Sequence, residues 1–272
     1  MDHHPPTPEE LARRSTRSES SAWQTLKKFF APLAVVGVLL AKLKWVLVPI
    51  LKFFPILLKT GGTMLLTIWV YAMNWGWWYA FGFVLLIFVH ECGHLVAAKR
   101  VGLKVGAPVF IPFLGALIMP KEEIPHAWIE AQVGIGGPLL GTLGAVVCYL
   151  LYPLTGNPLF AALAYTGFLL NLFNLAPVGF LDGGRIATAL SPWLWVVGIV
   201  IIGVLLFTHF NFLLLLIFIS SLPRLFSLVR RRTAAEARYF EVTPAQRWTM
   251  AALYFGLVGF LALAMTVAHV RL

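Results

Sequence analysis

The chain has 272 residues, of which 60% are hydrophobic and 12% are charged, and its mean hydropathy is +0.84. This composition excludes a water-soluble globule, because too little polar surface is available to cover one of this length. The net charge of +10 does not indicate nucleic-acid binding, since its distribution along the chain fits a membrane surface. The two cysteines, Cys92 and Cys148, lie inside apolar runs and imply no disulfide framework.

The first 60 residues are expected to lie outside the membrane core. Residues 1–28 form a polar N-terminal tail without a removable signal peptide. Residues 29–60 are predicted to be an interfacial amphipathic segment, because lysines interrupt each apolar run before it reaches spanning length. The alternative is a full span over 29–51, which would carry the basic tail across the membrane.

Seven later stretches are apolar over the roughly 17 to 25 residues that a spanning helix needs. They cover residues 61–77, 78–98, 128–152, 158–178, 192–208, 210–228 and 248–269. Twenty of the 21 lysines and arginines then fall on one side, which is predicted to be cytoplasmic together with the N-terminus. The predicted fold is an all-α membrane protein, a polytopic bundle of about six to eight transmembrane helices. Its parts are a membrane core at 61–228, a cytoplasmic linker at 229–247 and a C-terminal transmembrane helix at 248–272.

Residues 104–123, between the second and third spans, differ from their neighbours. Two β-prone runs, "PVFIPF" and "ALIMP", flank Leu114 and Gly115. They predict a short membrane-associated β-hairpin. Because bare strand edges cannot face lipid, this hairpin must pack on protein or pair with another strand.

Three ionisable residues stand near the end of the span 78–98. His90 and His94 are four residues apart, so they share one helix face and can hold one metal ion, for which Zn²⁺ is the natural choice. Glu91 lies about 100° round the helix, where it can face a water on that ion as a general base. The pattern predicts hydrolysis of an amide. The alternative is a pair of core histidines beside a neutral glutamate, which would all need buried partners.

A catalytic zinc takes three protein ligands and keeps an open position, so a third ligand must come from elsewhere. Asp182 is favoured, because it follows the span 158–178 on the side of the membrane where His94 lies. Its alternative role is to cap a helix that starts at Gly183. Three histidines qualify by type only, two of them on the wrong side and one in a solvated loop: His209, His269 and His126.

The motif H-E-x-x-H within a span is followed by "GIGGPLLG" at 134–141 and by "NLFNLAPVGFLDGGR" at 171–185. In this order the motifs resemble the site-2 protease family of intramembrane zinc metalloproteases, in a compact form without a PDZ or CBS domain. The resemblance covers residues 78 to 190. Relatives often carry a second proline where this chain has Gly179, which predicts a looser turn before Asp182.

The resemblance implies one Zn²⁺ per chain and a role for each matching residue. The zinc ligands would be His90, His94 and Asp182, with Glu91 as the catalytic base. Asn174 matches a position that helps to hold the substrate backbone or the developing oxyanion. For Asn174, and more so for Asn171, helix packing through hydrogen bonds is the alternative. The glycine-rich segment at 134–144 is interpreted as a closely packed helix.

The resemblance also implies a function, regulated intramembrane proteolysis. The chain would be an endopeptidase that cleaves transmembrane segments of membrane protein substrates near the cytoplasmic face, with the hairpin pairing with the unwound substrate. Its expected partners are the lipid bilayer and a transmembrane protein substrate, but no nucleic acid, and a regulatory membrane partner is left open. The expected location is the bacterial inner membrane. The alternatives are a metal or proton transporter that uses the same His/Asp site, and a catalytically silent scaffold for membrane helices.

Overall fold

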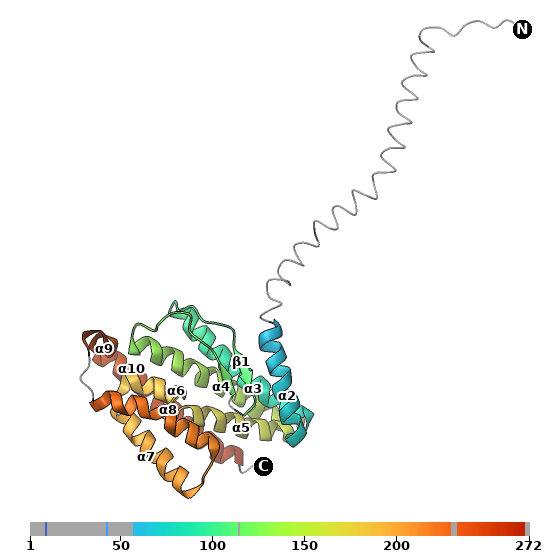
Figure 1. Cartoon of the computed structure of the whole chain (residues 1–272). Coiled ribbons are helices and arrows are strands. Elements are labelled where there is room, and N and C mark those ends of the chain that lie inside the picture. The colour runs from blue at the N-terminus through green and yellow to red at the C-terminus, as the bar shows by residue number, and fades with distance from the viewer. Residues whose placement is uncertain (1–8, 10–41, 43–56, 114, 230–232, 270–272) are drawn as a thin grey trace, which may run out of the picture. The chain divides into compact units, whose positions relative to one another are not determined.

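The computed structural model describes residues 9, 42, 57–113, 115–229 and 233–269. The predicted tail at 1–28 and nearly all of the predicted interfacial segment at 29–60 lie outside the described residues. The elements from Leu58 onward form one folded unit (Figure 1). In chain order the elements are a π-helical turn η1 (Leu57–Gly61), α2 (Gly62–Trp75), α3 (Trp77–Arg100), β1 (Val109–Ile111), β2 (Gly115–Leu117), α4 (Ala127–Thr155), α5 (Pro158–Asn174), α6 (Asp182–Leu190), α7 (Trp193–Thr208), α8 (Phe212–Val229), α9 (Ala234–Tyr239) and α10 (Pro244–His269).

Each of the seven predicted spans coincides with a helix. Among the described residues, α3, α4 and α10 are both long and apolar enough to cross a bilayer. The remaining four are shorter, since α2, α5, α7 and α8 have 14, 17, 16 and 18 residues. The predicted fold class, a helical membrane protein with a small hairpin, is confirmed.

Local sequence explains where these helices begin and end. Gly156 has a φ of 66° and ends α4 in the left-handed conformation that glycine tolerates best. Asn157 then caps α5, because its side chain accepts a hydrogen bond from the Leu159 N–H at 3.0 Å. Pro158 occupies the first turn of α5, where its missing N–H is not needed.

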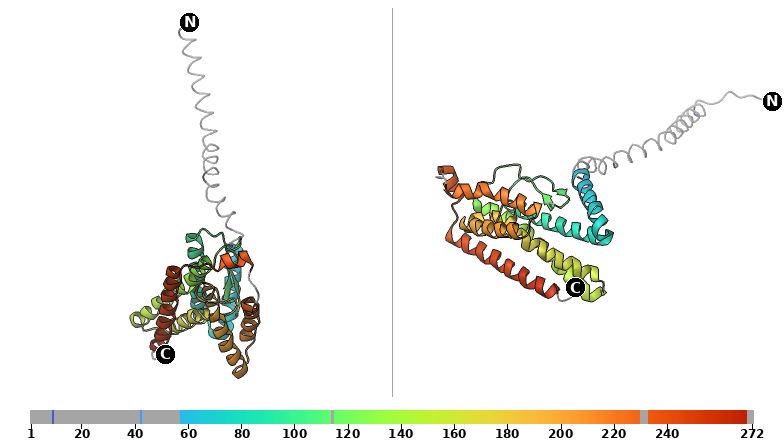
Figure 2. Two further views of the ribbon diagram at one scale, coloured as in Figure 1. Left: turned by 90° about the vertical axis from the view of Figure 1, so that its left-hand side faces the viewer. Right: turned by 60° about the horizontal axis from the view of Figure 1, so that its bottom comes forward.

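Helix α4 is the centre of the unit, because it contacts α3, α5, α6 and α10. Figure 2 shows α10 running along the side of α5, which it also contacts. Glycines let α3 and α4 approach closely, since a Cβ on Gly93 would lie 2.2 Å from the carbonyl oxygen of Gly136. The glycine-rich segment is therefore the closely packed helix that its sequence predicts.

The predicted hairpin is present, and it is attached to α2. Strands β1 and β2 are antiparallel, with Phe110 opposite Ala116. On the outer edge of β1, the Phe110 N–H donates to Thr63 Oγ1 at 3.1 Å, and Thr60 Oγ1 donates to the carbonyl oxygen of Pro108 at 2.7 Å. Thr60 of η1 and Thr63 of α2 thus supply the partners that this strand edge would otherwise lack in a membrane.

Candidate metal centre

The structure brings together three side chains that are distant in sequence. His90 and His94 lie one turn apart on α3, and Asp182 is the first residue of α6. The two Nε2 atoms are 3.1 Å apart, His90 Nε2 is 3.1 Å from Asp182 Oδ2, and His94 Nε2 is 3.2 Å from Asp182 Oδ1. All three side chains are buried. Leu181 is the N-cap residue of α6, so Asp182 does not have the capping role considered as its alternative.

The second ring nitrogen of each histidine, Nδ1, forms a hydrogen bond with an oxygen. His90 Nδ1–H donates to Asn171 Oδ1 and His94 Nδ1–H donates to the carbonyl oxygen of Val133, both at 2.8 Å. The Asn171 oxygen is fixed as the acceptor, because its Nδ2 donates to the carbonyl oxygen of Gly167 at 2.7 Å. Each ring therefore carries its proton on Nδ1 and presents a lone pair at Nε2.

Two imidazole lone pairs and a carboxylate thus converge on one point, an arrangement that needs a cation. Ligand atoms about 2.0 to 2.1 Å from a tetrahedral zinc are about 3.3 Å from one another. The 3.1 to 3.2 Å separations among the His90, His94 and Asp182 atoms are close to this value. The donor set of two neutral imidazoles and one carboxylate fits Zn²⁺ in both type and spacing.

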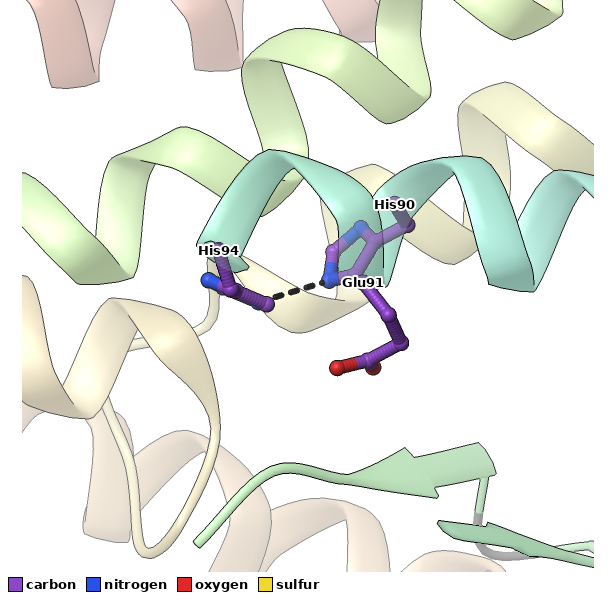
Figure 3. A group of neighbouring side chains, drawn as sticks. All are labelled: His90, Glu91 and His94. Atoms are coloured by element: carbon purple, nitrogen blue, oxygen red, sulfur yellow. Dashed lines mark hydrogen bonds between the residues drawn. The ribbon is translucent and has the colours of Figure 1, made fainter. Parts of the chain in front are cut away.

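Glu91 lies beside this group. A ring nitrogen of His90, a ring nitrogen of His94 and a carboxylate oxygen of Glu91 all lie within 4.8 Å of one another. Figure 3 shows the Glu91 carboxylate on the side of α3 that faces the hairpin. A carboxylate in this place can reach a water bound to an ion at the imidazoles, as a general base must.

His90, Glu91, His94 and Asp182 line a cavity of about 320 Å³, and so does Arg185. Asn174 lies in its wall, and its Nδ2 donates to the carbonyl oxygen of Leu170 at 3.0 Å, within its own helix. The structure therefore places Asn174 within the site but not among the groups that hold the imidazoles. Most of the remaining wall is apolar, and the hairpin contributes to it through residues that include Phe113, Gly115, Ala116 and Ile118.

Two glycines of α4 shape the site directly. A Cβ on Gly137 would lie 2.2 Å from His94 Nε2, and one on Gly141 would lie 2.3 Å from Asn171 Oδ1. These contacts are too short for any side chain. Gly179, in the turn before α6, has a φ of 52° and packs closely against Ser220 and Ser221 of α8, so this position favours glycine.

Sequence reasoning gave too little weight to Asn171 and none to Glu130. For Asn171 the favoured alternative was helix packing, but its amide oxygen orients the His90 ring. Glu130 is a buried carboxylate inside the predicted span 128–152, and a charge in a span was the signal that could have found it. The three histidines that qualified only by type are all exposed and lie away from the site: His126, His209 and His269.

Residues 78–158 match peptidase family M50. Zinc metalloprotease MJ0392 of Methanocaldococcus jannaschii is 33% identical over 126 residues, which cover 43% of this chain and 36% of that protein. The probable zinc metalloprotease EGY2, chloroplastic, of Oryza sativa subsp. indica is 29% identical over 150 residues, which cover 39% of this chain and 27% of that protein. The protein of the same name from Arabidopsis thaliana is 27% identical over 148 residues, which cover 38% of this chain and 26% of that protein.

The match over residues 78–158 and the named zinc metalloprotease relatives support a likeness to peptidase family M50, the site-2 protease family. The chain spans about a third of the length of the curated relatives it matches, or less. The M50 match includes His90, Glu91 and His94 but ends before Asp182. The place of Asp182 beside the histidines therefore comes from the structure, and family and donor set agree on Zn²⁺.

Proposed function

We propose that this chain is a zinc-dependent intramembrane endopeptidase. The observation that carries the proposal is the convergence of His90, His94 and Asp182, each within 3.2 Å of the others, in a helical membrane protein similar to family M50. When bound, Zn²⁺ would lower the pKa of a water and polarise the scissile carbonyl. His90, His94 and Asp182 would hold the ion, and the fourth position would face the cavity.

The chain's own residues would then transfer the proton and bind the substrate. Glu91 accepts a proton from the attacking water and later delivers it to the leaving amine. Asn174, in the cavity wall, would bind the substrate backbone or the developing oxyanion through the Nδ2 hydrogen that its bond to Leu170 does not use. The mainly apolar wall suits substrate side chains from a transmembrane segment.

Strand β2 is the part of the hairpin that would receive the unwound substrate. The Phe110 N–H points away from β2, toward Thr63, so Phe110 and Ala116 form a non-hydrogen-bonded pair. The N–H and C=O of Ala116 then point away from β1, and Ala116 lines the cavity. The outer edge of β1 is the less suitable edge, because Thr60 and Thr63 already bond to the backbone of Pro108 and Phe110.

The setting of this activity is also part of the proposal. The substrate would be a transmembrane protein cleaved near the cytoplasmic face, the chain would lie as a multi-pass protein in a bacterial inner membrane, and a regulatory membrane partner would control access. Topology rests on the positive charge of the predicted cytoplasmic loops. The competing function is a metal or proton transporter. Substitution of Glu91 distinguishes the two, because the protease needs this carboxylate as its general base.

The test compares the reconstituted protein with Glu91→Gln on a panel of single-span substrates. Glu91→Gln should reduce cleavage about 10²- to 10⁴-fold, the contribution of a general base, while bound zinc remains at one per chain. Glu122→Gln is the matched control, since that carboxylate pairs with Lys104 at the surface. Equal product from Glu91→Gln and the unmodified protein would end the protease proposal, and zinc uptake into vesicles that survives the substitution would support a transporter.

A further inference from the structure

A second group of polar side chains lies beside α6. Glu130, in the first turn of α4, is only 9% exposed, so its carboxylate needs partners. Its Oε2 accepts hydrogen bonds from Thr188 Oγ1 at 3.2 Å and from the Tyr239 hydroxyl. Its Oε1 lies 3.4 Å from Arg224 Nη2 and 4.0 Å from Arg185 Nε. We call these five residues, which come from α4, α6, α8 and α9, the Glu130 cluster.

The Glu130 cluster also contacts the part of α6 that contains Asp182. Arg224 Nη1 donates to the carbonyl oxygen of Gly184 at 2.9 Å, and the Trp195 indole N–H donates to the same oxygen at 3.0 Å. Gly184 is two residues after Asp182, in the same turn of helix. The cluster also reaches the side chain of Asp182, because Arg185 Nη1 is 3.9 Å from Asp182 Oδ1. The Glu130 cluster thus contacts both the carboxylate of Asp182 and the backbone beside it.

Tyr239 brings a segment outside the predicted spans into this group. It is the last residue of α9, a six-residue helix that closes its own N-terminus with a capping box of Thr233 and Glu236. Burial and, second, the charge of the Glu130 carboxylate raise the pKa of the Tyr239 hydroxyl above its ordinary value. The hydroxyl therefore remains protonated at neutral pH and donates to Glu130.

We propose that Glu130 is a positioning residue that couples the docking of α9, through Tyr239, to the orientation of Asp182. With α9 docked, Glu130 is held on both oxygens and in turn holds Arg185 and Arg224 against the first turn of α6. When α9 undocks, Glu130 loses a donor and the two arginines lose a fixed partner. The site for the metal then becomes less well ordered. The inference rests on the metal site of the proposed function, and it makes α9 the place where a regulator acts.

The test measures metal binding by the full-length protein in detergent. Zinc affinity is obtained by competition with a chromophoric chelator, and the geometry of the ligands is read from the absorption bands of the Co²⁺-substituted protein. The variants are Glu130→Gln, which removes the charge, and Tyr239→Phe, which removes one hydroxyl. Their controls are Glu122→Gln at the surface and Tyr165→Phe, whose ring packs near His269 away from the Glu130 cluster.

Glu130→Gln should weaken zinc binding about 10-fold, as substitutions behind a metal ligand do. Tyr239→Phe should weaken it about fivefold, the effect of one hydrogen bond. Both should shift the Co²⁺ bands, and neither control should. The double variant should bind zinc no more weakly than Glu130→Gln alone, because Tyr239 acts through Glu130.

Unchanged zinc affinity and Co²⁺ bands in both variants would overturn the proposal. Additive losses in the double variant would overturn the coupling through Glu130. Because neither measurement uses proteolysis, a chain that shows the expected metal binding but cleaves no substrate would refute the proposed function and leave the positioning role of Glu130 standing.

Discussion

At the scale of single residues, two asparagines one turn apart in α5 have different surroundings. Asn171 is 1% exposed, and both ends of its amide are used, toward His90 and toward the carbonyl oxygen of Gly167. Asn174 lies in the cavity wall and bonds only within its own helix through Nδ2. The first amide therefore acts on the His90 imidazole, whereas the second lines the cavity, where we propose that it binds the substrate.

Substitution of the two asparagines should separate these roles. Asn171→Leu should weaken zinc binding about 10- to 100-fold, because His90 Nδ1–H loses its acceptor, and Asn171→Asp should restore most of the affinity. Asn174→Leu should leave zinc affinity unchanged and reduce cleavage. Zinc titration and a cleavage assay on the same three variants check both statements. Wild-type zinc affinity in Asn171→Leu would show that the hydrogen bond to His90 has no effect on the site.

The sequence predicted the residues whose placement follows from helix periodicity or from membrane topology. His90 and His94 share a helix face at any four-residue spacing, and Asp182 follows from which side of the membrane its helix reaches. Neither argument gives the rotation of α5 about its axis or the crossing of α4 over α6. The partners of Asn171 and Glu130 depend on those two quantities, which is why their roles could be seen only in the structure.

At the scale of elements, the absence of side chains on one face of α4 is as important as the ligands. Gly137→Ala should lower zinc binding at least 10-fold and destabilise the protein, because the new methyl group would lie 2.2 Å from His94 Nε2, with the rigid ring unable to move without losing Val133. Gly256→Ala in α10 is the matched control, since its methyl group meets nothing within 4 Å. Thermal unfolding and zinc titration measure both. Equal behaviour of the two variants would contradict a packed contact between α4 and the His94 ring.

The hairpin allows an equally local test. Ala116→Pro removes the N–H that points away from β1, but it removes no hydrogen bond between the strands. We expect cleavage to fall at least 10-fold while zinc affinity is unchanged, whereas Ala116→Val, which keeps the N–H, should cleave nearly normally. Cleavage of a panel of single-span substrates by the two variants is the measurement. Full activity of Ala116→Pro would rule out strand addition at β2.

At the scale of the whole molecule, hydropathy located the helices well but not their lengths. All seven predicted spans fall on helices, since apolar runs of this length have no other stable form in a bilayer. Helix α5, however, ends at Asn174 and not at 178, because the chain must turn there to bring Asp182 back toward α3. That turn and the short buried helix α6 bring Asp182 to the two histidines, a placement that hydropathy does not report.

Metal binding should therefore contribute to the stability of the whole unit. His90 and His94 belong to α3 and Asp182 to α6, 92 residues from His90. An ion held by all three would therefore join two elements that both pack against α4. Ligand binding to the folded state alone stabilises it by about 4 kcal/mol at a free concentration 1,000 times Kd. Zinc should accordingly raise the unfolding temperature of the purified protein in detergent, and chelation should reverse the shift. Asp182→Asn should lose this shift and Glu91→Gln should keep it, because only the first removes a ligand. A zinc-dependent shift of full size in Asp182→Asn would mean that α6 does not contribute to the metal site.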